Sequence, residues 1–436
     1  MEQFCKYLFF ILALVGTACN KNNRELVEDL DKVIRALPGQ SPLEYSNQYL
    51  EDLLNWEDYS VIGLGEGTHG TLDFFELKQR LFRFLVEQHN CRTLAYEYSF
   101  RKSLLVNDYI QHRQDGLDSL FRGDLWIQDN DALRQFISWM RAFNDGRDEQ
   151  DQISFIGIDN QIDALMIDEV LAQIESYLPG LGTDPELFPY NVPGKEELKY
   201  ERMNEQQYGE LTEAFLELRM QVQSHILSLK PQEKERGSVA LQLVSALQGS
   251  HDFLYLTGTE GKNIRDLQLA ENVLEIPHAR AGSRPVVVWA HNAHVACNPH
   301  YTSDGSPAMG WYLRDSLRER YLSVATSFSV GQFTAVMLDS AGNDTPPLTC
   351  QIRSDPPRES LNALFHQTRY QQFSLIMEDL NSDSLLYRFF NTERPMIGVG
   401  DLYLGSPEMH FTDDRIINLV KAHDLLFYYR DTRPLL

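Results

Sequence analysis

Cysteine is scarce in this sequence, and positive charge is outnumbered by negative charge. The 436 residues include 5 cysteines, none in zinc-like spacing, so no disulfide framework is expected. We expect Cys297, among apolar neighbours, to be a buried thiol. Lys and Arg total 39 against 63 Asp and Glu, which gives a formal net charge of −24. Because nucleic acids and anionic membranes are bound through basic patches, this balance argues against both as partners.

Two familiar hydrolase signatures are also absent from the sequence. There is no H-E-x-x-H, the zinc-protease motif, and no G-x-S-x-G nucleophile elbow. Serine-hydrolase chemistry on an α/β-hydrolase scaffold is therefore not expected. The hydrophobic residues, 43% of the chain, are enough for one large α/β domain or two small ones.

The apolar run near the N-terminus, Tyr7–Ala18, is too short to span a bilayer as a stable helix. It ends in the small residues Gly-Thr-Ala directly before Cys19, which is typical of a lipoprotein cleavage site; an ordinary signal peptide cut nearby is the alternative. We therefore expect a signal peptide over residues 1–18 and lipidation of Cys19, with a tether over residues 19–24. The protein would be exported and held by its lipid on a bacterial membrane, periplasmic or at the cell surface.

The stretch VIGLGEGTHG, residues 61–70, organises the rest of the chain. Its apolar start predicts a buried strand, and an amphipathic helix follows its glycines. In α/β sheets such a turn lies at the carboxyl end of the strand, where ligands bind. The glycines are expected to adopt backbone angles that other residues resist, and so to shape a turn that carries Glu66 and His69.

Three interpretations of this turn compete. GEGTHG matches the dinucleotide pattern G-x-G-x-x-G, but Glu66 would then point a carboxylate at a pyrophosphate. A purely structural glycine turn is the second interpretation. The third, a catalytic acid–imidazole pair, is favoured because similar groups recur at later strand ends.

Those later strands also end in acids or histidines. We expect strands at Thr93–Glu97, Ile153–Asp159 and Val286–Trp289, the last followed by His291 and His294. Further strands are predicted at 322–328 and 396–399. Strands that alternate with helices predict an α/β fold with a mostly parallel central sheet. The domain would cover residues 25–436, with a helical insertion over the cleft at about 185–280.

Three acids and three histidines at one sheet edge admit two chemistries. In one, an imidazole held by a carboxylate takes a proton from water, which attacks an ester or amide. In the other, histidines and a carboxylate bind zinc. Structural roles compete with both: His291 and His294 as core histidines, Glu97 paired with Arg101, and Asp159 as a helix cap.

Six motifs resemble the erythromycin esterase family, in the family's order: GEGTHG, FFELKQRLFRFLVE, AYEYS, IGIDNQ, NIRDLQLAENVL and VVVWAHNAHV. The resemblance implies an α/β fold with helices on both faces and a deep cleft. It also implies hydrolysis of a macrolide's lactone ester by activated water, with no metal or other cofactor. The family's general base matches His69, and its partner matches Glu66. Further active-site positions match Glu97, His291 and His294.

The resemblance also suggests three substrate-binding residues, Lys78, Arg265 and Asn272. Asp159, which ends a strand at the same edge, and Glu76 are further candidates for substrate binding. The expected partner is a small-molecule ester, and the membrane is contacted only through the lipid anchor. Many family members act on other substrates than macrolides, so antibiotic resistance does not follow. A metal-dependent hydrolase or protease using the same cleft, and a non-catalytic lipoprotein that binds haem or another ligand, are the alternatives.

Overall fold

The structure is a computed structural model, and it describes most of the chain. The described residues are 23–121, 124–161, 163–183, 188, 203–256, 259–298, 307–411 and 416–436. The predicted signal peptide, Cys19 and most of the predicted tether lie outside them. Among the described residues no helix is long and apolar enough to cross a membrane.

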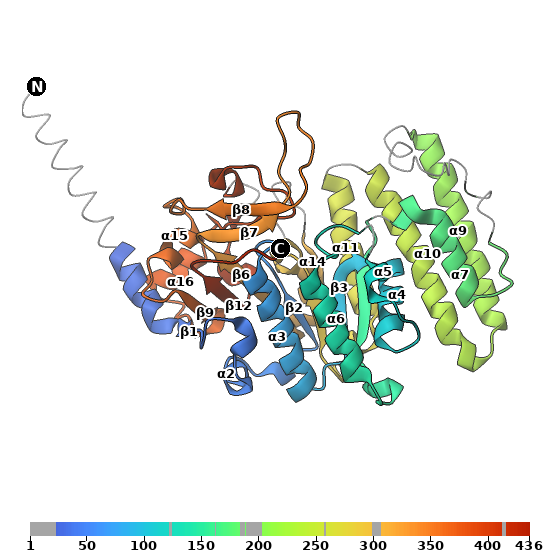
Figure 1. Cartoon of the computed structure of the whole chain (residues 1–436), viewed down its shortest axis with the longest axis horizontal. Coiled ribbons are helices and arrows are strands. Elements are labelled where there is room, and N and C mark those ends of the chain that lie inside the picture. Colours follow the sequence, from blue (N-terminus) through green and yellow to red (C-terminus); the bar gives the residue numbers. More distant parts are fainter. Residues whose placement is uncertain are drawn as a thin grey trace, which may run out of the picture.

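An eight-stranded sheet forms the centre of the fold (Figure 1). Its order is β1 (Arg35–Ala36), β9 (Gln372–Ile376), β12 (Leu425–Tyr429), β6 (Tyr321–Phe328), β2 (Val61–Leu64), β5 (Val286–Trp289), β3 (Thr93–Ser99) and β4 (Ser154–Asp159). Every pairing from β12 to β4 is parallel, and β9 runs antiparallel to both of its neighbours. The predicted α/β fold with a mostly parallel sheet is confirmed.

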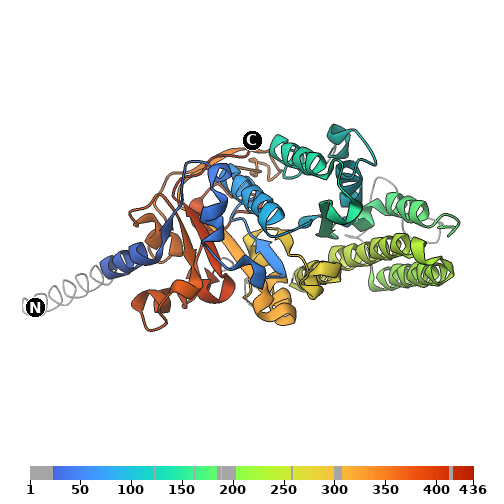
Figure 2. The same ribbon diagram turned by 90° about the horizontal axis from the view of Figure 1, so that it is seen from below.

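Helices cover both faces of the sheet. Residues 23–33 are helical, and the other α-helices are α2 (Asn47–Glu51), α3 (Leu72–Gln88), α4 (Phe100–Ile110), α5 (Leu117–Leu120), α6 (Asp131–Asn144), α7 (Ile167–Tyr177), α9 (Glu205–Ser228), α10 (Lys234–Tyr255), α11 (Thr259–Glu275), α12 (Pro277–Ala281), α13 (Asn292–Val295), α14 (Met309–Leu317), α15 (Leu361–His366), α16 (Leu385–Phe390) and α17 (Leu419–Ala422). Figure 2 shows α3 and α6 on one side of the sheet and α14 on the other.

Alternation along β2 explains how one short strand is buried on both faces. Ile62 and Leu64 join the core under α3 and α6, whereas Val61 packs with residues of α11 and α14. All three side chains are fully buried. An unbroken apolar run is what a central parallel strand needs, because successive side chains point to opposite faces.

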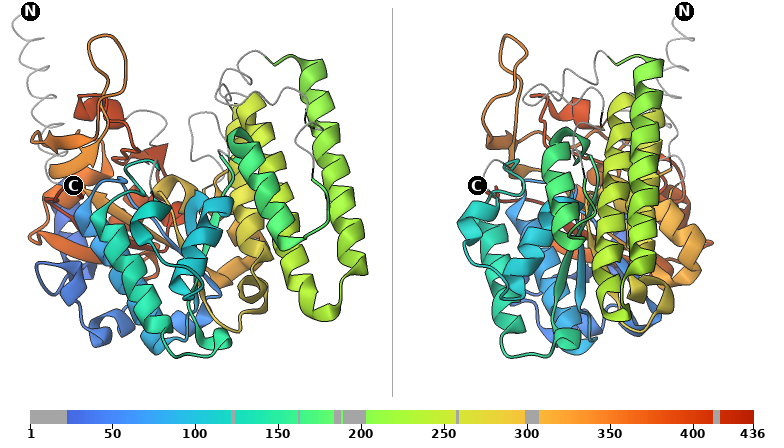
Figure 3. Two further views of the ribbon diagram at one scale, coloured as in Figure 1. Left: turned by 45° about the vertical axis from the view of Figure 1, so that its right-hand side comes forward. Right: turned by 90° about the vertical axis from the view of Figure 1, so that its right-hand side faces the viewer.

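The helical insertion stands beside the sheet. The antiparallel helices α9 and α10 pack with α7 and lie beyond the edge strand β4 (Figures 1 and 3). They were expected over the cleft. Among the described helices of the insertion, α11, which follows them, returns to the carboxyl edge of the sheet, because its apolar side packs against the core around β5.

Two small sheets complete the C-terminal half: β7 (Gly331–Ala335) pairs with β8 (Leu348–Ile352), and β10 (Arg394–Pro395) with β11 (Ile416–Ile417). The strand predicted at 396–399 is wrong. Val399 makes only an isolated bridge to Thr68, so this apolar run is core filling beside the glycine turn.

Candidate active site

A cavity of about 300 Å³ lies at the carboxyl ends of the parallel strands. Most of the residues predicted for the site line it together: Glu66, His69, Glu97, Asp159, Arg265, His291 and His294. They come from the loops after β2 and β5, from β3 and β4, and from α11 and α13. Parallel strands bring these ends to one edge, so positions far apart in the sequence meet.

The glycines of the turn are needed for close approach. The prediction of unusual backbone angles is wrong, because Gly65, Gly67 and Gly70 are not among the glycines with positive φ in the described part of the chain. A Cβ on Gly70 would lie 1.9 Å from the carbonyl oxygen of Thr334, and one on Gly65 would lie 2.4 Å from Oδ1 of Asn292. The turn is therefore pressed against β7 and α13, which fixes where its acid and imidazole lie.

Glu66 holds His69 with one carboxylate oxygen and Lys78 with the other. His69 Nδ1 lies 2.7 Å from Glu66 Oε1, and Lys78 Nζ lies 2.5 Å from Oε2. Lys78 is only 1% exposed, and its ammonium sits 4.4 Å from the ring centroid of Trp289. Because Nδ1 donates to Glu66, the neutral imidazole of His69 keeps its lone pair on Nε2.

The surroundings shift the pKa values of both cations. Burial disfavours the charged imidazole of His69, but the hydrogen bond and the charge of Glu66 outweigh it, so its pKa is raised above 6.5. For Lys78 burial prevails over the attraction of Glu66 and lowers the pKa to about 8. Above its raised pKa, His69 is neutral and can accept a proton on Nε2.

His291 lies beside His69, with 5.1 Å between the ring centroids. Its Nδ1 accepts a hydrogen bond from the Ala293 backbone at 3.2 Å, because His291 caps the N-terminus of α13. That places the proton of a neutral His291 on Nε2. The two histidines therefore offer complementary groups, an acceptor on His69 and a donor on His291.

Arg265 is the centre of a second, fully charged cluster. Its Nε and Nη2 donate to the two oxygens of Asp159 at 3.1 and 2.8 Å, and Nη2 also donates to Glu97 Oε1 at 2.9 Å. His294 Nε2 lies 3.2 Å from the same Glu97 oxygen, and its Nδ1 lies 2.8 Å from Asp266 Oδ1. The other oxygen of Glu97 accepts the backbone N–H of His291 at 2.9 Å.

Opposite charges keep this buried cluster ionised. Burial works against the charge on His294, but Asp266 and Glu97 raise its pKa to about 10. Burial likewise opposes the charge on Glu97, and His294 and Arg265 hold its pKa well below the ordinary value. At neutral pH the wall of the cavity therefore carries a fixed imidazolium and a fixed guanidinium, each compensated by carboxylates.

The pairing that competed with a role for Glu97 does not occur. Glu97 meets Arg265, whereas Arg101 pairs with Glu169 at 2.8 Å. Asp159 accepts one backbone N–H, from Gln161 at 3.2 Å, but both of its oxygens are engaged by Arg265. The two acids therefore position a cation at the cavity.

Three predicted substrate-binding residues do not line the cavity. Glu76 accepts hydrogen bonds from Ser41 at 2.9 Å and from Arg433 at 2.6 Å. It is two residues before Lys78, and residues two apart on a helix point to nearly opposite sides, so Glu76 points away from the cavity. Asn272 donates a hydrogen bond to the carbonyl of Ile158 at 2.8 Å. It follows Arg265 by seven residues, which places it about 10 Å further along α11. Lys78 itself lies beneath Glu66.

Asp266 is a residue of the site that the sequence did not predict. It lies next to Arg265 on α11, and its Oδ1 is close to both His294 Nδ1 and the backbone N–H of Met309, each at 2.8 Å. Its adjacency to Arg265 in the motif was the available signal. Only the folded chain shows which side of the helix meets His294.

The outer wall of the cavity comes from the loop between α5 and α6. Leu125, Ile127 and Gln128 line the cavity, and Leu125 is 64% exposed. Asp124 ties this loop down by accepting hydrogen bonds from Tyr98 and Lys102. An exposed apolar residue that lines the cavity is placed to contact the apolar part of a ligand.

Metal binding was the rival chemistry for this edge of the sheet. Within the part of the chain that the structure describes, no group of three His, Cys, Asp or Glu side chains is arranged to hold a metal ion. His69 and His294 instead direct ring nitrogens at carboxylates. Cys91, Cys297 and Cys350 are buried free thiols, as expected for Cys297.

Comparison with known proteins gives relatives along most of the chain. This chain is 24% identical over 306 residues to an erythromycin esterase type II of Escherichia coli. The aligned region covers 62% of this chain and 70% of the relative. This chain is also 24% identical over 367 residues to a putative hydrolase of Bacillus subtilis, covering 74% and 76% of the two chains.

Solved structures share the fold. A Bacillus cereus protein superposes with a TM-score of 0.75 at 20% identity, over 94% of this chain and 98% of that one. An erythromycin esterase mutant in its open conformation gives a TM-score of 0.64 at 16% identity, over 92% and 98%.

The model of the erythromycin esterase family matches residues 86–432. The matched range contains Glu97, Arg265 and His294 and begins after the glycine turn. Because it covers most of the chain, the match shows the family, as the sequence motifs predicted. The chain belongs to the erythromycin esterase family.

Proposed function

We propose that the protein is a hydrolase that cleaves a carboxylic ester, of the kind found in a lactone, with water activated by His69 and without a metal. The observation that carries the proposal is the 2.7 Å contact between His69 Nδ1 and Glu66 in the wall of the cavity. A carboxylate on one nitrogen of an imidazole leaves the other nitrogen to act as a general base.

The first step is proton transfer from water to Nε2 of His69. Glu66 stabilises the imidazolium that forms, and the ammonium of Lys78 pairs with the other oxygen of the buried Glu66 carboxylate. The oxygen of the activated water attacks the ester carbonyl. When the tetrahedral intermediate collapses, His69 returns its proton to the leaving alkoxide, and a carboxylic acid and an alcohol are released.

The other polar groups of the cavity suit the negative charge of that intermediate. Nε2 of His291 provides a hydrogen-bond donor, and His294 with Arg265 provides fixed positive charge. Glu97 positions all three groups, since it accepts from the backbone of His291 and pairs with both cations. Donors fixed before the reaction stabilise an oxyanion without reorganisation.

A direct experiment is to incubate the purified protein with erythromycin, other lactones and p-nitrophenyl esters, and to follow acid release and product mass. We expect a mass gain of one water on the cleaved lactone, with the same rate before and after treatment with EDTA or 1,10-phenanthroline. Stoichiometric zinc in the active protein, with activity lost on its removal and restored by zinc, would contradict the metal-free mechanism.

We also propose that the protein is exported and held on a membrane by a lipid. The apolar run before Cys19 supports export and a lipid anchor at that cysteine, and the net charge of −24 leaves the lipid as the membrane contact. The substrate would then be met outside the cytoplasm.

A further inference from the structure

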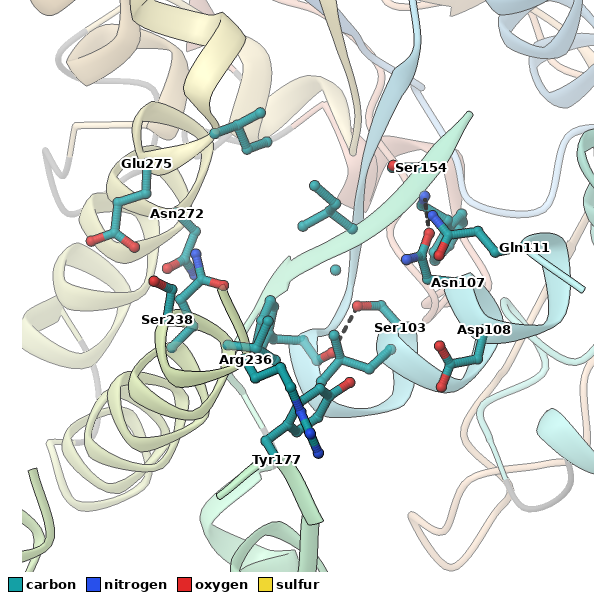
Figure 4. A pocket seen from close by; sticks show the side chains of 18 of the residues that line it. Ser103, Asn107, Asp108, Gln111, Ser154, Tyr177, Arg236, Ser238, Asn272 and Glu275 are labelled. Atoms are coloured by element: carbon teal, nitrogen blue, oxygen red, sulfur yellow. Dashed lines mark hydrogen bonds between the residues drawn. The ribbon is translucent and has the colours of Figure 1, made fainter. Parts of the chain in front are cut away.

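A second and larger cavity lies away from the candidate active site. Its volume is about 820 Å³, within the range of small-molecule sites, and it lies between the outer edge of β4 and helices α4, α7, α10 and α11 (Figure 4). Strand residues 154–157 and Asn160 form its floor. Six residues of extended strand span about 20 Å, so the cavity is long enough for a chain of several linked units.

The cavity is poorly suited to an added peptide strand, although β4 is the last strand of the sheet. The outward N–H of Phe155 donates to Oδ1 of Asn107 at 3.0 Å, and the carbonyl of Ile158 accepts from Asn272 at 2.8 Å. Side-chain amides from α4 and α11 thus occupy backbone positions that a peptide would need for strand addition.

Charges around the cavity are balanced, so an anionic ligand is not favoured. Arg113 is paired with Asp108 at 3.4 Å and with Glu149 at 3.0 Å. This leaves Arg236, whose Nη2 donates to the Ser176 carbonyl at 2.9 Å, and Glu275 on the neighbouring helix α11. Figure 4 shows these two side chains on neighbouring helices at one side of the cavity.

Neutral hydrogen-bonding groups make up most of the polar lining. Five amides and four serine hydroxyls line it: Asn107, Gln111, Asn160, Gln242 and Asn272, and Ser103, Ser154, Ser176 and Ser238. Gln111 Oε1 is buried and has no hydrogen-bond partner among the described residues. A buried acceptor left without a donor is costly, so a donor that reached it would be favoured.

The remaining lining is apolar, with Leu104, Ile156 and Val239 near the ring of Tyr177. Sugars combine hydroxyl edges with apolar C–H faces, and a long cavity with neutral amides and an aromatic wall matches both. We propose that this cavity binds a neutral oligosaccharide. The inference does not depend on the proposed hydrolase function, because the cavity shares none of the histidines or of the acids that line the active site.

The test is calorimetric titration of the purified protein with cellohexaose, maltohexaose, laminarihexaose and chitohexaose, beside a pectin-derived hexagalacturonate of the same length. We expect at least one neutral hexasaccharide to bind one to one with a millimolar or lower Kd, and at least about tenfold more tightly than the polyanion. Binding of none of the neutral chains, or equal binding of the polyanion, would overturn the proposal.

Two variants locate the binding, and one controls for the substitution. Gln242→Ala and Tyr177→Ala remove an amide and a ring from the cavity, and each should weaken binding about tenfold, the loss of one good contact. Gln223→Ala makes the same change on an exposed position of α9 and should bind as the unaltered protein does. Ester hydrolysis should stay unchanged in all three. Binding that survives both cavity substitutions would also overturn the proposal.

Discussion

Glu66 is the residue on which the chemistry of the site depends most. It is 6% exposed and shared between an imidazole and an ammonium that compete for its charge. Glu66 raises the pKa of His69, whereas the charge of Lys78 lowers it. The base strength of His69 is therefore a balance between two buried neighbours, and changing either one should move it in a known direction.

This balance predicts a pH profile. His69 must be neutral to accept a proton, and its pKa lies above the ordinary value of about 6.5. The logarithm of kcat/KM should therefore rise with pH and level off above that pKa. Steady-state hydrolysis measured from pH 5 to 9 checks this; a rate that is flat across pH 6 to 8, with chemistry limiting, would contradict it.

Lys78→Met removes the cation but keeps an unbranched side chain of similar length. Since the charge of Lys78 lowers the pKa of His69, its loss should shift the ascending limb of the profile to higher pH. Leaving a buried carboxylate with one partner fewer also costs about 3–5 kcal/mol in unfolding free energy. Glu76→Gln, on the other side of the same helix, should leave the limb in place. A limb that moves to lower pH in Lys78→Met would refute the balance.

At the scale of elements, the strand–turn–helix unit places the base. Gly70 packs so closely on Thr334 that β7, from the C-terminal half, supports a turn from the N-terminal half. The nearest atoms to a Cβ there are backbone, which cannot move aside as a flexible side chain can. Space, rather than backbone angle, is what these glycines provide.

Two glycine-to-alanine substitutions distinguish a steric clash of the added Cβ from the general preference of a helix for alanine over glycine. Gly70→Ala should lower the unfolding free energy by at least about 1–3 kcal/mol, because its Cβ would overlap the Thr334 carbonyl. Gly209→Ala lies in α9 with nothing within 4 Å of the new Cβ, and should raise it by about 0.5–1 kcal/mol. Urea unfolding of both variants measures this. Equal stability of the two would show that the turn is not tightly packed.

The elements that the sequence predicted best are those with a strong local pattern. Val286–Trp289 forms β5 with the predicted bounds, and the amphipathic helix predicted after the glycine turn is α3. β12, the apolar run LLFYY, and β9 were not predicted, because short apolar runs do not distinguish a strand from filling. The same ambiguity made 396–399 a strand where the fold has an irregular segment.

The predicted residues at strand ends lie together in the candidate site, whereas those on helices do so only in part. Glu66, Glu97 and His291 follow strands of one parallel sheet, so a shared edge follows from the topology. Glu76 and Asn272 were placed by a motif on a helix, and the motif does not say which side of the helix meets the cavity. Asp266 was missed for the same reason.

At the scale of the whole molecule, two cavities of different character border the central sheet. The polar lining of the smaller one, at the carboxyl edge, is mostly charged, and the polar lining of the larger one, beside β4, is mostly neutral amides and hydroxyls. The helical insertion beside β4 forms one wall of the larger cavity, and α11 borders both. The insertion thus extends the fold sideways and leaves the mouth of the active-site cavity to the loop around Leu125.

The proposed lipid anchor at Cys19 determines where in the cell the whole molecule is found. If Cys19 carries a lipid, Cys19→Ser should move the protein from the membrane fraction to the soluble fraction of the cell envelope. Fractionation of the producing bacterium, with immunoblotting of each fraction, measures this. An unaltered protein that is already soluble after export would favour an ordinary signal peptide.

The central claim is that His69 is the general base, and hydrolysis by His69→Ala tests it most directly. With the ester found to be cleaved, kcat/KM should fall by a factor of about 10² to 10⁴, while the thermal unfolding midpoint stays near that of the unaltered protein. His366→Ala, which replaces a histidine outside the lining of the cavity, is the matched control and should keep its rate. A folded His69→Ala protein that hydrolyses the ester at a near-normal rate would contradict the account.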